Sequence, residues 1–403
     1  MNVFFLTMAS LTEVDSHGIY QDLIRKFRDE GHDVYIVCPR ERRLGEKTHL
    51  YETSGVHILG VRTLNLFKTN FIEKGVGQVL VESQYKRAIR NFLGNVKVDL
   101  VLYSTPPITF PKVIQYLIKN NPSAKTYLLL KDIFPQNAVD LGLMTKTGIR
   151  GLLYKFFRNK EKKLYAMSDH IGCMSPANVR YVREHNDEIV PEKVELAPNS
   201  YERLEQNDMT DEEQKAIREK YNLPAGHPIF IYGGNLGKPQ GIPFLIQCLD
   251  ANGNRQDCHF VVIGDGTEYG KLETWYISRK PCSVSLFKSM PKEEYDQLVR
   301  SCDVGLIFLD YRFSIPNYPS RLLPYLMEKK PIIAATDPNC DMGSLASENG
   351  YGLWCTSNNV DAFTNCVNQM IGSNIKQMGE NGYKYYLNNY TVEHTYNAIM
   401  KHF

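Results

Sequence analysis

A loop with four glycines and one lysine, YGGNLGKPQG at 232–241, has the composition of a phosphate-binding loop. It follows an apolar run at 228–232 and precedes a segment of helical spacing from about 242 to 249. Glycine leaves backbone amides open to a ligand and lysine adds charge, although the loop matches neither the Walker pattern nor the G-x-G-x-x-G spacing. A glycine-rich turn with a solvated lysine is the competing interpretation. The candidate contacts are Gly233, Gly234, Asn235, Gly237 and Lys238.

An arginine lies in a second such segment, IPNYPSRLLPYLMEKKPIIAATD at 315–337. Prolines punctuate its start, leucines recur at helical spacing, and a short apolar run follows, so we expect a loop, a short helix and a buried strand. The first amides of a helix lack partners and attract anions, and an arginine there adds a permanent charge. An ordinary strand, loop and helix is the alternative. The candidate contacts are Tyr318, Ser320 and Arg321.

Two other loops also follow apolar runs. The first, GDGTE at 264–268, offers Gly264, Gly266 and Glu268 to a base or a ribose, and its signal is weak when taken alone. The second, KDIFPQNAVDLG at 131–142, places Asp132 at the carboxyl end of an expected buried strand. A carboxylate held there is a candidate base or hydroxyl acceptor. The alternative is a cap of the following helical turn.

The loop after the first expected strand contains DSHG at 15–18, where the first helix should begin. Unpaired amides at that position attract anions, and an imidazole binds phosphate or sugar groups. Ser16, His17 and Gly18 are therefore candidate ligand contacts. A capping Asp or Ser beside a solvated His is the alternative.

Apolar runs alternate with amphipathic segments along both halves of the chain, as in doubly wound α/β folds. A charged stretch poor in aliphatic residues, at about 200–222, separates the two series. We predict two Rossmann-like parallel-sheet domains, 1–200 and 201–384, with a helix from about 385 to 403 that packs back on the first domain. Open α/β sheets bind ligands at the carboxyl ends of their strands, so an interdomain cleft is the expected site.

The composition is that of a folded protein, with 43% hydrophobic and 23% charged residues among 403. No stretch has the apolar length of a membrane span, and the first ten residues read as a buried strand and not as a signal peptide, so we expect a cytoplasmic protein. The nine cysteines show no paired spacing and are expected to be reduced. The histidines show no paired ligand spacing either, and a DxD element is lacking, so neither a metal nor a cofactor is expected.

The first 200 residues carry an excess of Lys and Arg, whereas the rest carry an excess of Asp and Glu. The basic half predicts an anionic partner surface or is simply an uneven solvated surface. Nucleic acid is not expected, because basic residues are not interleaved with aromatic ones in a recognition motif. The segment 151–167 is basic and amphipathic, and it either lies on a membrane surface or packs onto its own sheet.

Taken together, the motifs resemble family 4 of the retaining glycosyltransferases, which have two Rossmann-like domains in the arrangement called GT-B. The resemblance covers nearly the whole chain, and the DIFP turn and the PSR segment are most similar to the branch that builds bacterial surface polysaccharides. It rests on EGHDVYIV, KDIFPQNAVDLG, APNS, YGGNLGKPQGI, VVIGDGTE, SMPKEEYDQLVRSCDVGLIFL and YPSRLLPYLMEKKPIIA.

The chain departs from the family at two signature positions. The family has two glutamates with seven residues between them, and here both places, 316 and 324, are proline. Proline at 324 requires a helix that begins close to it. In the glycine loop, Asn235 and Gln240 stand at the places of the family's Arg and Lys. The resemblance therefore leaves Lys238 and Arg321 to hold a diphosphate, and Glu268 or backbone to hold the ribose.

The resemblance implies hexosyl transfer from a nucleoside diphosphate sugar to a lipid-diphosphate-linked glycan, with retention and without a metal. In this scheme Asp132, Lys238 and Arg321 are catalytic, the glycine loops with Pro291, Tyr318 and Ser320 bind the donor, and the loop with His17 binds the acceptor. The basic half would contact the membrane peripherally. A nucleotide-sugar 2-epimerase and a non-catalytic nucleotide-binding subunit are the alternatives.

Overall fold

The computed structural model describes residues 1–66, 71–203 and 208–403. It divides the chain into two compact units, which are described separately: an N-terminal unit, Met1–Glu202 with Thr391–Phe403, and a C-terminal unit, Arg203–Tyr390. The chain thus passes between the units at 202/203 and returns at 390/391, close to the predicted 200/201 and about 385.

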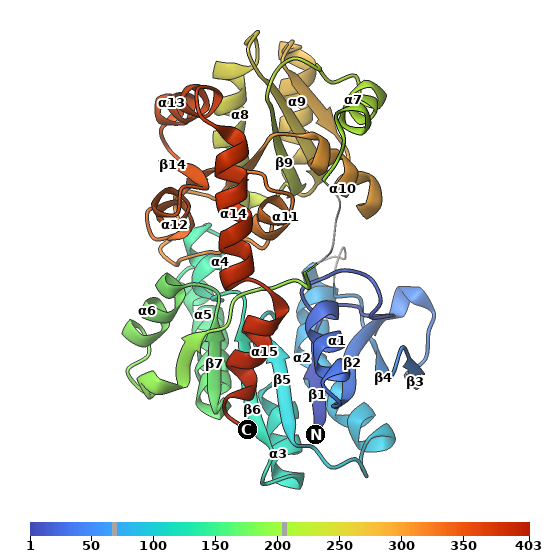
Figure 1. Cartoon of the computed structure of the whole chain (residues 1–403). Coiled ribbons are helices and arrows are strands. Elements are labelled where there is room, and N and C mark those ends of the chain that lie inside the picture. Colours follow the sequence, from blue (N-terminus) through green and yellow to red (C-terminus); the bar gives the residue numbers. More distant parts are fainter. Residues whose placement is uncertain (67–70, 204–207) are drawn as a thin grey trace. The chain divides into compact units, whose positions relative to one another are not determined.

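The N-terminal unit is built on an eight-stranded sheet of order β3-β4-β2-β1-β5-β6-β7-β8, in which only β3 and β4 pair antiparallel (Figure 1). Its central parallel strands, such as β1, β5 and β6, are apolar and buried on both faces because helices cover both, as parallel sheets require. The elements are β1 (Asn2–Leu6), α1 (Gln21–Asp29), β2 (Asp33–Glu41), η1 (Arg42–Leu44), β3 (His49–Thr53), β4 (Val56–Thr63), α2 (Phe71–Phe92), β5 (Leu100–Ser104), α3 (Pro111–Asn120), β6 (Lys125–Leu130), α4 (Gln136–Asp140), α5 (Gly148–Met167), β7 (His170–Cys173), α6 (Pro176–Glu184), η2 (Pro191–Lys193), β8 (Val194–Leu196) and α15 (Val392–Met400).

The C-terminal unit has a six-stranded parallel sheet of order β11-β10-β9-β12-β13-β14. Its core joins the strand faces to α8 and α13. The elements are α7 (Asp211–Lys220), β9 (Ile229–Asn235), η3 (Lys238–Gln240), α8 (Ile242–Asn252), β10 (His259–Asp265), α9 (Tyr269–Arg279), β11 (Val284–Phe287), α10 (Lys292–Ser301), β12 (Val304–Phe308), α11 (Leu322–Met327), β13 (Ile332–Thr336), α12 (Met342–Glu348), β14 (Gly352–Thr356), α13 (Val360–Ile371) and α14 (Ile375–Asn389).

The last helix, α15, belongs to the core of the N-terminal unit. It lies beside α1 (Figure 1), and its Val392 and Ile399 join the cluster formed by Phe27 of α1 and the strand residues Val3 and Phe5. The apolar side of α15 is therefore buried against a sheet whose strands are distant from it in sequence.

The predicted fold class, two doubly wound α/β units, is confirmed. Pattern analysis did not anticipate β14 or α14. The helix α14 was missed because it contains glycines, which usually indicate a turn. A Cβ on Gly379 would lie 1.9 Å from the carbonyl oxygen of Lys329, and one on Gly382 would lie 3.0 Å from Leu326. Residues that suggest a turn therefore mark close packing of α14 on α11. Among the described residues, no helix is long and apolar enough to cross a membrane.

The loops that the sequence analysis singled out follow the carboxyl ends of parallel strands. The loop with His17 follows β1 and Asp132 follows β6 in one unit; the glycine loop follows β9 and the GDGTE loop follows β10 in the other. Within each unit, these loops emerge at the same edge of the sheet.

A glycine in β12 tests the packing that supports the glycine loop. A Cβ on Gly305 would lie 2.3 Å from the ring of Tyr325, which is fully buried, so Gly305→Ala should lower stability by about 1–3 kcal/mol through overpacking. Urea unfolding followed by circular dichroism measures the change. Gly270→Ala is the control, because Gly270 lies in α9 with nothing near its Cβ position, and it should be neutral or stabilising. Equal effects of the two substitutions would contradict this packing.

Candidate functional site

The glycine loop ends β9 where β10 runs against it. A Cβ on Gly264 would lie 1.8 Å from the carbonyl oxygen of Gly234, and one on Gly266 would lie 2.4 Å from that of Leu236. Gly234 itself has a φ of +120°, a conformation that favours glycine. The packing of the two strand ends therefore accounts for Gly264 and Gly266, and their predicted contact with a ligand stays a prediction.

Two tyrosines hold Gly233 in place. The hydroxyl of Tyr325 in α11 donates to the carbonyl oxygen of Ile231 at 3.0 Å and accepts from the amide of Gly233 at 3.3 Å. A Cβ on Gly233 would lie 2.1 Å from the hydroxyl of Tyr295 in α10. The start of the glycine loop is thus packed against two tyrosines from different helices. The sequence analysis had named neither Tyr295 nor Tyr325 as a site residue.

Arg321 lies against this loop. Its guanidinium stacks over the ring of Tyr232, 4.4 Å from the centroid, and Nη2 is the nearest atom to the Cβ position of Gly234, at 3.4 Å. Nη1 is buried and has no hydrogen-bond partner among the described residues. Burial by itself lowers the pKa of Arg321, but Tyr232 and Tyr325 outweigh it and the pKa rises, so the charge is kept. A charge that is buried without a counterion attracts an anion.

The helix that follows contributes less than the sequence suggested. α11 has only six residues, and Arg321 at its N-cap already has right-handed helical dihedrals. It begins two residues before Pro324, close to the proline as predicted. A helix this short adds little dipole, so the positive charge at this place is that of the Arg321 side chain.

Lys238 is exposed and begins η3. The loop below it is closed by Gln240, whose side-chain oxygen accepts from the amide of Gly237 at 3.2 Å and from Asn235 Nδ2 at 2.9 Å. Asn235 and Gln240, which stand where the resembling family has Arg and Lys, therefore hydrogen-bond to each other. This leaves Lys238 as the basic side chain of the glycine loop.

The four remaining predicted contacts of this unit are engaged by other residues or lie at helix starts. Glu268 is 6% exposed and pairs with Lys271, one turn into α9. The hydroxyl of Tyr318 is buried and hydrogen-bonds that of Tyr390, and Pro291 is the N-cap of α10. Ser320 is half-buried, and its carbonyl oxygen accepts from Leu323 at 3.1 Å. The structure brings Arg321 to the glycine loop, whereas it commits Glu268 and Tyr318 to pairs within the unit.

In the N-terminal unit, Asp132 follows β6 and is largely buried. Asn137 Nδ2 donates to both carboxylate oxygens at 2.8 Å, and the backbone amide of Asp132 bonds the hydroxyl of Thr105 at 3.3 Å. Its side chain does not cap α4, whose N-cap is Pro135 without a side-chain bond. Burial raises the pKa of Asp132 to about 6, partly opposed by the bonds to Ile133 and Asn137. A carboxyl with this pKa can exchange a proton near neutral pH.

The preceding residue shares this environment. Burial lowers the pKa of Lys131 to about 7. Sequence reasoning missed Lys131 because a lysine at the end of a strand is usually solvated. Two adjacent groups whose pKa values approach neutrality from opposite sides are a feature typical of functional sites.

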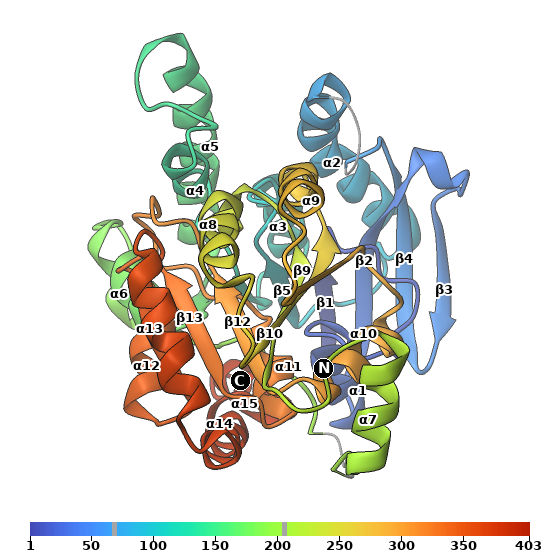
Figure 2. The same cartoon turned by 90° about the horizontal axis from the view of Figure 1, so that it is seen from above.

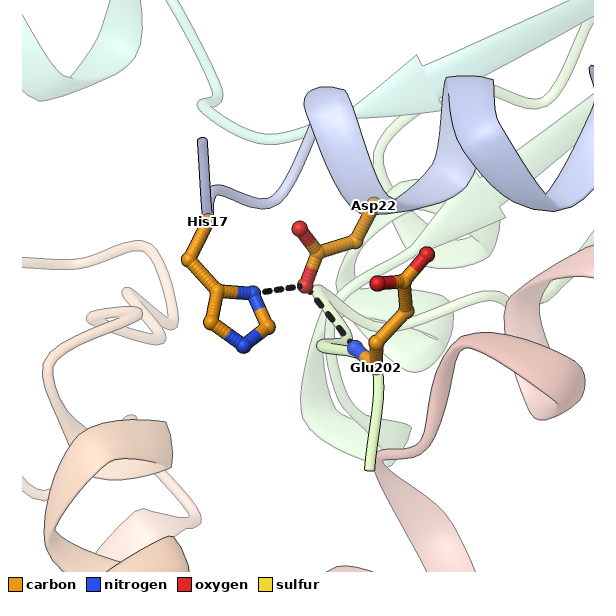
Figure 3. A group of neighbouring side chains, drawn as sticks. All are labelled: His17, Asp22 and Glu202. Atoms are coloured by element: carbon orange, nitrogen blue, oxygen red, sulfur yellow. Dashed lines mark hydrogen bonds and ion pairs between the residues drawn. The ribbon is translucent and has the colours of Figure 1, made fainter. Parts of the chain in front are cut away.

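The predicted acceptor loop is organised by a buried carboxylate, Asp22 of α1 (Figure 3). Asp22 is fully buried and accepts from His17 Nδ1 at 2.8 Å, from the amide of Gly18 at 3.0 Å and from the amide of Glu202 at 2.8 Å. Burial raises the pKa of Asp22, but these bonds outweigh it and the pKa is lowered. The Nε2 atom of His17 is buried without a partner among the described residues, and is therefore the ring nitrogen left for a ligand.

The loop's other members are held by Arg25 and Glu13. The guanidinium of Arg25 bonds Asp22 and Glu202, each at 2.7 Å, and the carbonyl oxygen of Ser16 at 2.8 Å. His17, Asp22 and Glu202 offer ligand atoms within 4.8 Å of one another, a spacing that a cation site would need. The guanidinium already supplies its positive charge. Ser16 donates its hydroxyl to Glu13 at 2.5 Å, so sequence reasoning found the loop but not the acids that shape it.

A family model described as glycosyl transferases group 1 matches residues 213–385 of the chain. Among curated proteins, the chain is similar to the probable glycosyltransferase WbjE of Pseudomonas aeruginosa, with 23% identity over 77% of this chain and 75% of that protein. It is also similar to the putative colanic acid biosynthesis glycosyl transferase WcaI of Escherichia coli (strain K12), with 24% identity over 52% of this chain and 49% of that one.

Solved structures share the fold over the whole chain. Sucrose-phosphate synthase from Thermosynechococcus elongatus has a TM-score of 0.76 at 13% identity, covering 100% of this chain and 98% of that one. Anabaena Alr3699/HepE in complex with UDP has a TM-score of 0.69 at 12% identity, covering 100% and 99%. The protein is therefore a glycosyltransferase of the GT-B fold, and its residues 213–385 match the glycosyl transferases group 1 model.

Proposed function

We propose that this glycosyltransferase belongs to the retaining family 4 and moves a hexose from a nucleoside diphosphate sugar to a lipid-diphosphate-linked glycan during surface-polysaccharide synthesis, without a metal. The observation that carries the donor assignment is the guanidinium of Arg321, which stacks on Tyr232 beside the glycine loop, with Nη1 buried and without a partner in the part of the chain that the structure describes.

A diphosphate fits this place on chemical grounds. Guanidinium groups bind phosphate oxygens through paired, charge-assisted hydrogen bonds, and a buried guanidinium gains most because water does not compete. Lys238 adds a second basic side chain, an exposed one, in the same loop. Of the structural relatives, HepE was solved with UDP, and this supports a nucleoside diphosphate as the donor's leaving group.

The polysaccharide assignment rests on the motif resemblance and on the name of the relative WcaI, a putative colanic acid enzyme. Proline stands at both places of the family's two glutamates, 316 and 324. This difference keeps a non-catalytic nucleotide-binding subunit as the second candidate, whereas no observation favours an epimerase.

During transfer, the bond between the anomeric carbon and the diphosphate oxygen breaks, the acceptor oxygen bonds to that carbon, and the proton of the acceptor hydroxyl passes to the departing diphosphate oxygen. Negative charge grows on the departing diphosphate, where Arg321 and Lys238 stabilise it. Asp132 orients a hydroxyl of the acceptor or of the donor through its carboxylate. Retention requires that the new bond form on the face from which the diphosphate departs.

Arg321→Ala tests the donor site directly. The substitution should weaken UDP binding about ten- to hundredfold, because charge-assisted hydrogen bonds contribute about 1.5–3 kcal/mol. The rise of the unfolding temperature with UDP measures it, and GDP, CMP and dTDP define the base. Uridine, which lacks the diphosphate, should bind the variant and the native protein alike. Arg279→Ala, at an exposed arginine of α9, is the control. An unchanged UDP response in Arg321→Ala would overturn the assignment.

Lys238→Ala tests the rate instead of the fold. The side chain is exposed, so the unfolding temperature should not change, whereas release of UDP from the donor should slow roughly tenfold or more because charge on the leaving group is less well stabilised. Turnover is followed by released UDP. Lys280→Ala, another exposed lysine of the C-terminal unit, should keep the native rate. Binding without turnover in the native protein, with every donor tried, would instead support the non-catalytic subunit.

Asp132→Asn separates activity from stability. The carboxyl binds a proton more tightly in the folded protein, so its contribution to stability is present below about pH 4 and is lost as the pH rises through about 6. The substitution should therefore stabilise the protein increasingly between about pH 4 and pH 7, by about 1.4 kcal/mol for each unit of raised pKa, while transfer is lost. Thermal unfolding at several pH values measures this effect. A gain that does not depend on pH would contradict the raised pKa.

A further inference from the structure

Helix α5 is amphipathic along its whole length but buried along only part of it. Leu164 and Tyr165 in its C-terminal half are buried in the N-terminal unit. In its N-terminal half, Leu152 is 66% exposed, Leu153 45% and Phe156 44%. The expectation that the apolar side of this segment packs onto its own sheet therefore holds for one half of the helix and fails for the other.

A surface cavity of about 650 Å³ lies between α5 and α3. The two helices stand next to each other in the N-terminal unit (Figure 2). Four lysines line the cavity, and only Lys160 has a carboxylate partner among the described residues, Glu82 of α2 at 2.8 Å. The other three are exposed and have no carboxylate partner among the described residues: Lys112, Lys119 and Lys163.

The exposed apolar residues and the lysines form one strip. Along α5, Leu152, Phe156, Lys160, Lys163 and Met167 recur at intervals of three or four residues, which places them on one side of the helix. On α3 the lining residues Lys112, Gln115 and Lys119 follow the same spacing. The strip therefore passes from bare leucine and phenylalanine at one end to a lysine-lined cavity at the other.

We propose that this α3–α5 strip docks on a membrane surface that contains anionic lipids. Lysine ammonium groups would meet the lipid phosphates, while the apolar half of α5 enters the boundary between headgroups and acyl chains, as amphipathic interfacial helices do. A soluble anion would use the lysines but would leave Leu152, Leu153 and Phe156 in water. The juxtaposition of bare apolar side chains with unpaired lysines is what favours a lipid surface over a soluble anion.

The strip is connected to the candidate site by contact. Phe156 packs against its neighbour Phe157 with ring centroids 5.3 Å apart, and Phe157 packs on Phe134 at 5.1 Å. Phe134 lies in the turn that contains Asp132. A bilayer bound to α5 would therefore hold this turn near the lipid headgroups, where a lipid-linked acceptor is anchored.

Flotation of the whole protein with phosphatidylcholine vesicles, with and without phosphatidylglycerol, tests the docking surface. We expect binding only to the anionic vesicles, weakened by salt. Leu152→Gln/Phe156→Gln should reduce the partition about tenfold or more, because two apolar side chains no longer leave water. Ile277→Gln is the matched control, since Ile277 lies in the other unit and is 64% exposed. It should bind like the native protein.

A second variant separates the charge from the apolar contact. Lys112→Gln/Lys119→Gln/Lys163→Gln should also lose binding to the anionic vesicles, whereas Lys280→Gln/Lys376→Gln/Lys384→Gln removes as much charge from exposed sites elsewhere and should retain it. All substituted side chains are exposed, so the unfolding temperatures should match the native value. Equal binding to neutral and anionic vesicles, loss with the control set, or an apolar face that instead forms a dimer on size exclusion would overturn the proposal. The outcome does not depend on transferase activity.

Discussion

The C-terminal unit holds a half-buried guanidinium that has no carboxylate partner among the described residues. Arg321 is kept charged between the ring of Tyr232 and the glycine loop, and the tyrosines that surround it also fix the backbone of that loop at Gly233. Leaving a guanidinium without a carboxylate costs stability unless a ligand compensates. Gly305 packs tightly on the ring of Tyr325, and Gly264 packs tightly on the backbone of Gly234. This packing fixes the strand end and the tyrosine that support the glycine loop beside Arg321.

The N-terminal unit uses buried charge in two different ways. Asp22 is fully compensated by imidazole, amide and guanidinium donors, so it acts as a structural centre that positions His17. Asp132 is compensated mainly by Asn137, and burial leaves its pKa near 6. The donors around Asp22 favour a carboxylate that stays ionised. The surroundings of Asp132 favour a carboxyl group that gains and loses a proton. Asp132 lies in the loop after β6, and Asp22, in the first turn of α1, holds the loop after β1, so both act where ligands meet such sheets.

The surfaces of α3 and α5 add a feature that the strand loops do not have. Half of α5 contributes to the core of its unit, and the other half exposes leucine and phenylalanine next to lysines. Exposed apolar side chains gathered beside lysines on one face of a helix are typical of an interaction surface. Phe157 of α5 packs on Phe134, which lies in the same turn as Asp132. The helix that carries the exposed apolar residues therefore also contacts the turn of the candidate site.

Local pattern determined much of this protein: the alternating apolar runs predicted both sheets, and the glycine loop, Arg321 and Asp132 stood out by residue type and position after a strand. What only tertiary structure decided was the state of each side chain. Glu268 and Tyr318 looked available yet pair with Lys271 and Tyr390, while Tyr232, Tyr325, Lys131 and Asp22 looked ordinary yet shape the sites. The physical reason is that burial and partners come from segments distant in sequence, and these set charge, pKa and exposure, whereas periodicity records only which face of an element is apolar.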